Sequence, residues 1–505
     1  TNSSLYHLDI NLSINYIYLM AVDNKIEWNF NNTYLSLPKI MLSEQKPDIV
    51  DKPEVVIINH ALSKELGLNL LDLDDEYLAS VFSGNSLPDG SKTISMAYAG
   101  HQFGHFTILG DGRTITIGEH VTQNNQGFEI QFKGSGKTKF SRDGDGKAAL
   151  GPMLREYIIS EAMHYLNIPT TRSLAVIKTG EKVIRETELK GAILTRVATS
   201  HLRVGTFQYF AYKKDDSNLK TLINFTINKH YPSLKNKENL YLNLIDKLME
   251  KQIDLIVNWM RVGFIHGVMN TDNMALSGET IDYGPCAFMD QYDPKSVFSS
   301  IDHFGRYAYY NQPSIAKWNL ARFAECLIPL LDSNKDKAIK LATDKINEFD
   351  KNYENKWLGM MRDKLGMIGN QKEDEVLILD LLQWMHINKA DYTNTFGNLT
   401  YENMINDKIF HKDDFLKWKE RWKIRLSVNN NGKTSEKTMK KSNPVVIPRN
   451  HLVEDALKTA ETGDLEKTNR LLKVLSEPYK IQSSIQDLQT SPKPNKIPYK
   501  TFCGT

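Results

Sequence analysis

The spacing of hydrophobic residues changes once along this chain of 505 residues, near residue 205, and that change restricts the possible folds. Before it, glycine-punctuated segments such as "TILGDGRTITIGEH" and "GFEIQFKGSG" have the pattern of β-strands, around one helical segment, "LGPMLREYIISEAMHYLN". After it, "LYLNLIDKLMEKQIDLIVNWMRVGF" and later segments repeat apolar residues at helical spacing. The sequence therefore predicts an α+β protein with a sheet-rich part followed by a helical part.

We expect four regions along the chain. Residues 1–90 form an extension packed on the main body, and 91–205 form a small sheet-containing lobe with a nucleotide loop. Residues 206–360 form a helical lobe with the catalytic and metal loops, and 361–505 add further helices and a tail with a cysteine. The polar stretch 427–443 is predicted to be a mobile connector. This order of lobes is that of the protein-kinase-like bilobal fold.

Composition argues against several classes of protein. Lys and Arg number 63 and Asp and Glu 61, so a net charge of +2 indicates no broad basic surface for nucleic acid. The apolar run near the start, residues 14–22, is shorter than the roughly 18 to 20 residues that cross a membrane, and no basic stretch precedes it as in a signal peptide. The three cysteines are scattered, which argues against a disulfide framework. We expect a protein that is not secreted and binds neither nucleic acid nor membrane.

The stretch "HGVMNTDN", residues 266–273, has the spacing of a kinase catalytic loop but lacks its acidic residue. His266 and Asn273 match the His that opens that loop and the Asn that binds Mg²⁺. The position of the catalytic Asp is occupied by Val268. Asp272 is the only carboxylate in the loop, so it is the local candidate to accept a proton from a hydroxyl. Alternatively, Asp272 makes only structural hydrogen bonds.

Asp282 is the second candidate metal ligand. The residues between Asn273 and Asp282, "MALSGETI", are long enough for two short β segments and a turn, which would bring both side chains to one Mg²⁺. An amide and a carboxylate oxygen are suitable ligands for this ion. "DYGP", which begins at Asp282, resembles the "DFG" element of kinases.

Glycines and basic residues in the sheet-rich part are candidates to bind phosphates. In "LGDGRTITIGE", Gly110 and Gly112 let the backbone approach a phosphate, and Arg113 can bind two of its oxygens, although a plain turn has the same glycines. Lys133 ends a strand where kinases carry a phosphate-binding Lys, and the spacing leaves Glu156 and Glu161 equally possible as its helical partner. "GSGKT" is not a Walker A motif, because its first glycine is replaced by Gln131.

Two further pairs of residues are weaker candidates. Asp145 and Gly146 lie in a glycine-rich loop before the predicted helix, where they could contact a ligand or cap that helix. Arg196 and Arg203 are seven residues apart, and such pairs are normally surface features. In one site with the upstream Lys and Arg, they would supply more positive charge than the transfer of a γ-phosphate requires.

The assembled segments resemble the selenoprotein O family, whose members have a kinase-like fold. The resemblance extends from about residue 30 to the C-terminus and includes "YAGHQFGHF", "LGDGRTITIGE", "LTRVATSHLRVGTF", "GFIHGVMNTDNMALSGETIDYGP" and "NPVVIPRNHLVEDAL". It implies a transferase that moves AMP from ATP, or UMP from UTP, to Ser, Thr or Tyr hydroxyls of proteins, with Mg²⁺ or Mn²⁺. It also implies that ATP lies flipped relative to a kinase, with its γ-phosphate buried and its α-phosphate presented for attack.

The resemblance also implies a role for each matching residue. Asp272 would accept the proton, Glu156 would pair with Lys133, and Asn273 and Asp282 would hold the metal ion. The implied nucleotide-binding residues are Gly110, Gly112, Arg113, Lys133, Asp145, Gly146, Arg196, Arg203 and Asp282.

Members of this family carry a selenocysteine or cysteine near the C-terminus, where this chain has Cys503. Its expected partner segment, "YDPKSVFSS", has no cysteine, so a redox pair would have to use Cys286. Bacterial members are cytoplasmic and eukaryotic members mitochondrial, which leaves both compartments open for this chain.

Two alternatives to nucleotide transfer are weighed on the same residues. A conventional kinase is disfavoured because the Asp on which that class relies is replaced by Val268. A nucleotide-binding pseudokinase scaffold is disfavoured because a complete set of metal and ion-pair residues is retained: Lys133, Glu156, Asn273 and Asp282.

Overall fold

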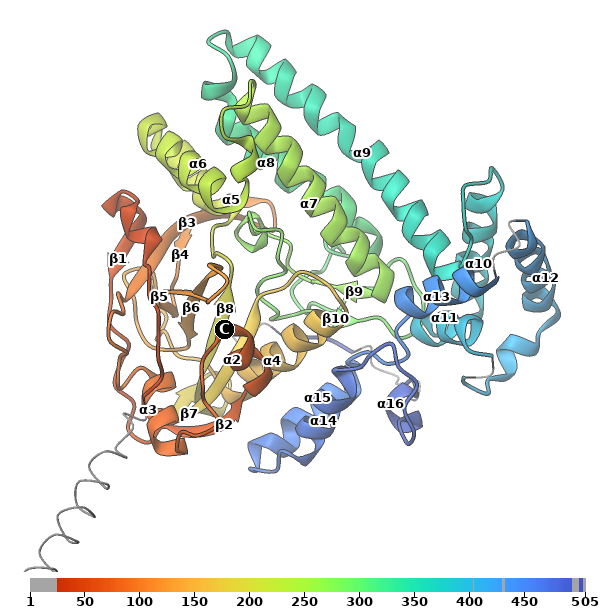
Figure 1. Cartoon of the computed structure of the whole chain (residues 1–505), viewed down its shortest axis with the longest axis horizontal. Helices are drawn as coiled ribbons and strands as arrows, with labels where there is room; N and C mark the ends of the chain where they lie inside the picture. The colour runs from red at the N-terminus through yellow and green to blue at the C-terminus, as the bar shows by residue number, and fades with distance from the viewer. Residues whose placement is uncertain (1–24, 403, 429–431, 493–498, 503–505) are drawn as a thin grey trace, which may run out of the picture.

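The computed structural model describes residues 25–402, 404–428, 432–492 and 499–502, which form a sheet-rich part and a helical part (Figure 1). The larger sheet has eight strands in the order β1-β3-β5-β6-β8-β7-β2, with β4 paired to β3, and its pairings are antiparallel. The strands are β1 (Leu42–Glu44), β2 (Glu54–Ile58), β3 (Ile94–Gln102), β4 (His105–Gly110), β5 (Thr114–Val121), β6 (Gly127–Lys133), β7 (Arg172–Ile184) and β8 (Glu188–Ala198). The predicted α+β class, with strands before helices, is confirmed.

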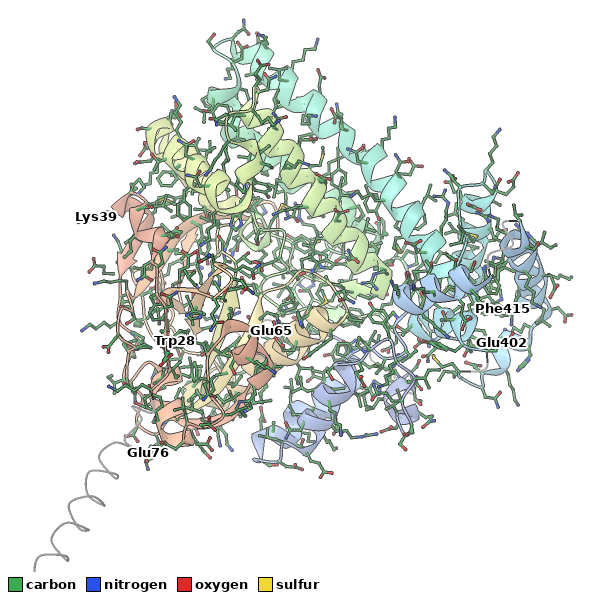
Figure 2. The ribbon with its side chains drawn as sticks, viewed as in Figure 1. Trp28, Lys39, Glu65, Glu76, Glu402 and Phe415 are labelled. Atoms are coloured by element: carbon green, nitrogen blue, oxygen red, sulfur yellow. The ribbon has the colours of Figure 1, made fainter. Side chains whose placement is uncertain are left out.

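Helices cover both faces of this sheet. The predicted helix is α4 (Leu150–Tyr165), which packs on β7 and β8 because most of its circumference is apolar and buried. On the other face, α2 (His60–Leu66) and α3 (Asp75–Ser83) close a smaller core. There the Trp28 ring, labelled in Figure 2, stacks on Phe30 with 5.2 Å between ring centroids. Because helices pack on both of its faces, the sheet holds the residues at its strand ends in place.

The helical part begins directly after β8. Its first members are α5 (Val204–Lys213), α6 (Asp216–His230), α7 (Leu240–Val262), α8 (Gln312–Leu331) and α9 (Lys335–Leu365). The apolar stripe of α7 is buried between α8 and α9, which lie alongside it (Figure 1). Short 3₁₀ turns are η1 (Thr33–Ser36), η2 (Lys39–Met41), η3 (Pro232–Leu234), η4 (Thr271–Asn273), η5 (Tyr309–Asn311) and η6 (Lys408–His411).

The last third of the chain adds α10 (Asp374–Asn388), α11 (Tyr392–Thr400), α12 (Asp413–Ser427), α13 (Gly432–Ser442), α14 (Asn450–Glu461), α15 (Glu466–Leu475) and α16 (Gln486–Gln489). Aromatic residues hold α12 in place: the Phe415 ring, labelled in Figure 2, lies 4.6 Å from that of Trp384. Both α14 and α15 return to pack against α4 in the sheet-rich part (Figure 1). No helix among the described residues has the length and apolar composition to span a membrane.

One local expectation was wrong. In the polar stretch 427–443, residues 432–442 form α13 and not a mobile connector, because Ser435, Met439 and Ser442 lie on one face that packs against α9, whereas residues 429–431 lie outside the described part of the chain. The segment between Asn273 and Asp282 has short β contacts on either side of a turn, as bridges that join Ala275 to Arg203 and Thr280 to Thr170. The loops of the site are also held by a two-stranded ladder of β9 (Phe264–Ile265) and β10 (Ala287–Phe288).

Candidate active site

A cleft of about 360 Å³ lies between the sheet-rich and helical parts, and residues singled out from the sequence line it. Its volume is in the range of small-molecule binding sites. The predicted residues that line the cleft are Gly110, Gly112, Arg113, Lys133, Asp145, Gly146, Arg196, Arg203, Asp272, Asn273 and Asp282. Residues from six separate segments of the sequence thus converge on one cavity.

The Asp282 carboxylate lies at the centre of a group of cations. Its Oδ1 accepts hydrogen bonds from Lys133 Nζ at 3.0 Å and Arg196 Nη2 at 2.5 Å, and its Oδ2 from Arg203 Nη1 at 2.9 Å. Burial by itself raises the pKa of Asp282, but the three cations hold that pKa well below its usual range. The backbone φ of 64° at Asp282 is rare for a residue other than glycine, and such backbone strain clusters at functional sites.

Glu156, and not Glu161, is the partner of Lys133. Lys133 Nζ donates to Glu156 Oε2 at 2.6 Å, and Arg196 donates to Glu156 Oε1 through Nε at 2.9 Å and Nη2 at 2.7 Å. Glu161, one and a half turns further along α4, pairs instead with Arg172 at 2.7 Å. The ends of β6 and β8 and one face of α4 therefore position both cations through a single carboxylate.

Arg203 connects this group to the catalytic loop. It lies at the start of α5, and its Nη1 also donates to the backbone oxygen of Asp272 at 2.8 Å. Its guanidinium carbon lies 4.6 Å from the ring centroid of Tyr98, a contact that favours the cation. The role of Tyr98 was missed in the sequence, although it begins the stretch "YAGHQFGHF" that takes part in the family resemblance.

Asp272 is enclosed beneath strand β3. Asp272 is only 7% exposed, and its Oδ1 has no hydrogen-bond partner among the described residues. A Cβ atom placed on Gly100 of β3 would lie 2.2 Å from this oxygen, so only glycine fits there. Burial raises the pKa of Asp272 to about 6, against the opposing effect of Arg203. A carboxylate with a pKa near neutrality is suited to act as a general base.

The two residues before Asp272 are also held by β3 and the turn after it. The backbone N–H of His101 donates to Thr271 Oγ1 at 2.7 Å, and that of Phe103 donates to Asn270 Oδ1 at 3.0 Å. The catalytic loop is therefore fixed to the sheet-rich part by side chains that the sequence pattern alone did not identify.

The side chains of Asn273 and Asp282 suit a divalent cation whose remaining ligands are phosphate oxygens and water. Asn273 Nδ2 donates to the backbone oxygen of Val268 at 2.9 Å, which leaves the amide oxygen available to a ligand. Among the described residues no group of three or more His, Cys, Asp or Glu side chains is arranged to hold a metal ion. Mg²⁺ commonly takes one or two protein oxygens and completes its coordination with phosphates and water. The two side chains present here match that mode of binding.

Asp145 and Gly146 lie at the rim of the cleft, where an arginine not predicted from the sequence joins them. Arg185 donates to both oxygens of the Asp145 carboxylate, at 2.9 and 3.1 Å, and its side chain also lines the cleft. Gly146 has a φ of 71°, and a Cβ there would lie 2.1 Å from the backbone oxygen of Gly136. This loop is therefore shaped by glycine and anchored by Arg185.

Of the predicted redox pair, only Cys286 lies among the described residues. Among the described residues Cys286 has no disulfide partner; its thiol is fully buried and donates to the backbone oxygen of Tyr283 at 3.2 Å, and burial raises its pKa to about 12. Cys503 lies outside the described residues, so its pairing with Cys286 stays a prediction. Thr501, near that end of the chain, donates through its hydroxyl to the backbone oxygen of Pro285 at 2.7 Å.

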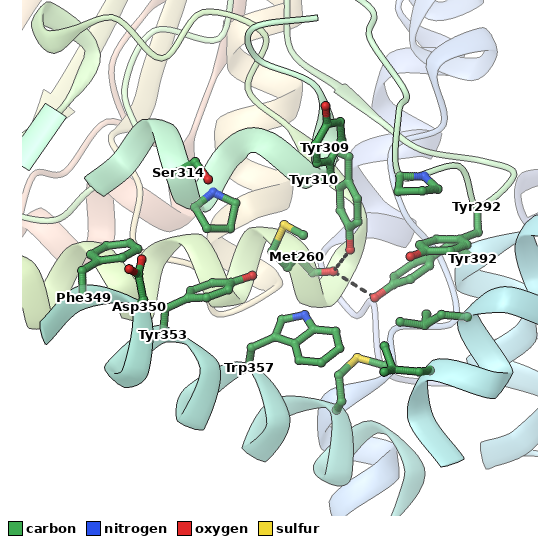
Figure 3. A pocket seen from close by; sticks show the side chains of 15 residues that line it. Met260, Tyr292, Tyr309, Tyr310, Ser314, Phe349, Asp350, Tyr353, Trp357 and Tyr392 are labelled. Atoms are coloured by element: carbon green, nitrogen blue, oxygen red, sulfur yellow. Dashed lines mark hydrogen bonds between the residues drawn. The ribbon is translucent and has the colours of Figure 1, made fainter. Parts of the chain in front are cut away.

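A second cavity, of about 380 Å³, lies among α7, α9, α10 and the segment before α8 (Figure 3). Aromatic rings dominate its lining, and the hydroxyls of Tyr309 and Tyr392 both donate to the backbone oxygen of Met260, at 2.7 and 2.9 Å (Figure 3). Asp350 is its only charged lining residue. A cavity without cations does not suit a triphosphate, so the first cleft is the candidate active site.

Comparison with known proteins finds relatives over nearly the whole chain. Residues 24–476 match the family model described as "Protein adenylyltransferase SelO". The protein nucleotidyltransferase YdiU of Pelagibacter ubique is 58% identical over 483 residues, which cover 95% of this chain and 100% of that protein. The proteins of the same name from Nitrosococcus oceani and Halalkalibacterium halodurans are 55% and 54% identical, and each match covers 95% of this chain and 98% of the relative.

Proposed function

This chain belongs to the SelO family of protein adenylyltransferases, and from that premise we propose that its cleft transfers AMP from ATP to a Ser, Thr or Tyr hydroxyl of a protein. The same reaction with UTP would transfer UMP. Nucleotide transfer as such follows from the family and from the names of its relatives. The identity of the transferred group, the orientation of ATP and the roles of single residues are the proposal.

The observation that carries the proposal is the convergence of Lys133, Arg196 and Arg203 on Asp282. All three cations are buried, so they lie at the inner end of the cleft. Cations there would bind the β- and γ-phosphates and stabilise the charge that develops on pyrophosphate as it leaves. The α-phosphorus would then face outward. This is the flipped orientation that the family resemblance implies.

The proposed reaction uses the groups of the catalytic loop in one displacement. The hydroxyl oxygen of the protein substrate bonds to the α-phosphorus of ATP, and its proton passes to the Asp272 carboxylate. The bond from the α-phosphorus to its bridging oxygen breaks, and pyrophosphate leaves with the bonding electrons. The product is a phosphodiester between AMP and the substrate. Asn273 and Asp282 would hold Mg²⁺ or Mn²⁺, which when bound neutralises phosphate charge.

The same contacts support a kinase-like fold. Lys133 at the end of β6 pairs with Glu156 of α4, as the phosphate-binding Lys of a kinase pairs with a helical Glu. The bilobal division into residues 91–205 and 206–360, flanked by the extension 1–90 and the region 361–505, remains part of this proposal.

One experiment separates the proposal from its alternatives. The protein is incubated with Mg²⁺, candidate protein substrates and ATP labelled on either the α- or the γ-phosphate. We expect protein-bound label only from α-labelled ATP. Label from γ-labelled ATP alone would identify a kinase, and label from neither would identify a nucleotide-binding scaffold.

A further inference from the structure

A surface next to the catalytic loop combines exposed aromatic rings with two arginines. We call it the Trp318 patch, and it consists of Phe106, Tyr212, Arg306, Trp318 and Arg322. These residues come from β4, the end of α5, the segment before η5 and α8. None of them takes part in the nucleotide cleft described above.

The two arginines are held against one ring. The guanidinium carbons of Arg306 and Arg322 each lie 4.9 Å from the ring centroid of Trp318. The imidazole of His101 meets the same ring edge-on at 5.2 Å. Cation–π contacts of this kind fix a guanidinium in place while leaving its N–H groups able to bind an anion.

The charge of these arginines is only partly neutralised. Arg322 pairs with Glu325 at 2.5 Å, whereas Arg306 forms no ion pair with a carboxylate among the residues that the structure describes. With Glu325 counted, the patch keeps a net positive charge at Arg306, which complements a carboxylate of a partner.

Around the arginines, large apolar side chains are open to solvent. Tyr212 is 60% exposed and Phe106 38%, and their rings lie 5.2 Å apart. Phe106, Tyr212 and Arg322 also line a hollow of about 210 Å³, which is large enough for one side chain. Neighbouring exposed aromatic residues are typical of surfaces that bind another protein.

The Trp318 patch is continuous with the catalytic loop. Tyr307, next to Arg306, donates through its hydroxyl to Asn270 Oδ1 at 2.6 Å, and Asn270 lies two residues before Asp272. The Phe103 ring lies 5.1 Å from that of Tyr307 and completes the connection to β3. Residues that flank a hydroxyl held at Asp272 therefore have this surface within reach.

We propose that the Trp318 patch binds the protein substrate beside its reacting hydroxyl and selects segments that carry an acidic residue near an apolar one. The carboxylate binds at Arg306 and Arg322, and the apolar side chain packs on Phe106 and Tyr212. This inference rests on the proposed function, because it concerns the substrate of the same site.

The test uses a positional-scanning peptide library in which each peptide has one central Tyr, Ser or Thr, together with Mg²⁺ and α-labelled ATP. At one or more flanking positions, Asp or Glu should give about fivefold more label than Lys, the effect expected of an ion pair at a surface. Arg306→Gln and Arg322→Gln should each reduce this preference, and Arg306→Glu should shift it toward Lys. Arg470→Gln, which removes an exposed arginine of α15, is the matched control and should keep the preference.

The outcomes distinguish a failure of the Trp318-patch proposal from a failure of the proposed AMP transfer. Melting temperatures and ATP affinities of the variants are measured alongside, and ATP affinity should not change, because neither arginine lines the nucleotide cleft. Label on peptides without an acidic preference, or a preference that survives both arginine substitutions, overturns the inference alone. Label on the protein itself but on no peptide does the same. If α-label appears on no protein or peptide, the proposed function itself fails.

Discussion

The side-chain amide of Asn273 donates to the backbone oxygen of Val268 at 2.9 Å. Val268 stands where kinases carry their catalytic Asp, and its own side chain is apolar and buried. The backbone of this position therefore orients the amide that we propose binds the metal ion, while the carboxylate of the loop is that of Asp272. The loop would in this way keep a metal ligand without the kinase residue.

Asp282→Ala should abolish α-label transfer, with a loss of at least about 100-fold, because it removes a metal ligand and the carboxylate that gathers three cations. Label transfer to a fixed protein substrate measures this effect. Asp380→Ala, which removes a half-exposed carboxylate paired with Arg421 on α12, is the control and should retain activity. Full activity in Asp282→Ala would refute the metal assignment.

Asp272→Asn should lower kcat by about 10² to 10⁴-fold and leave ATP affinity nearly unchanged, because the amide cannot accept the substrate proton. In the unmodified protein the rate should rise as pH increases from 5 to 7 and then level off, since the pKa of Asp272 is raised to about 6. A pH-rate profile under single-turnover conditions measures both effects. A profile that stays flat through this range would count against Asp272 as the base.

The stability of the same variant should depend on pH. The folded-state pKa of Asp272, about 6, lies above the ordinary value of 3.8, so the folded protein holds this proton more tightly than the unfolded chain does. The free energy of unfolding therefore falls as pH rises from about 3.8 to about 6. Asp272→Asn removes that penalty. Its melting temperature should therefore exceed that of the unmodified protein at pH 7.5 but not at pH 4. Equal differences at both pH values would show that ionisation of Asp272 does not destabilise the fold.

Glu156→Gln and Glu161→Gln form a matched pair on one helix. Glu156→Gln should reduce α-label transfer by about 10 to 100-fold, because Lys133 and Arg196 lose the carboxylate that positions them. Glu161→Gln disrupts only the pair with Arg172 and should change thermal stability more than turnover. Steady-state rates and melting curves of both variants are compared. Similar losses of activity would remove the distinction between these residues.

Gly100→Ala should inactivate the enzyme, because the added Cβ would lie 2.2 Å from Asp272 Oδ1 and displace the loop. Gly359→Ala in α9 has no atom within 4 Å of the added Cβ and should raise stability by about 0.5 to 1 kcal/mol without loss of activity. Denaturant unfolding and label transfer are measured for both. An active Gly100→Ala variant would show that Asp272 does not need its observed position.

The sequence was sufficient to predict elements with a strong period and residues with a specific chemical role. The strands around Lys133 and the helix at 150–165 follow from hydrophobic spacing, and many of the residues that line the cleft were identified by the family resemblance. The helix at Gly432–Ser442 was missed because few of its residues are apolar, and its burial depends on a neighbouring helix that lies far away in the sequence.

Partners distant in the sequence could not be predicted from local spacing. The choice of Glu156 over Glu161 depends on how α4 is rotated against β6 and β8, which is set by packing. Tyr98 and Arg185 join the site only because β3 and β7 bring them there. These residues become neighbours only in the folded protein, and the local sequence pattern around each of them does not indicate it.

The two backbone hydrogen bonds from His101 and Phe103 to Thr271 and Asn270 have a mechanical consequence. A hinge motion that parts the sheet from the helices must break both bonds at once, so the catalytic loop travels with the sheet as one body. The Asp272 carboxylate, which we propose accepts the proton, would then keep its place relative to the strands that carry Lys133 and Arg196.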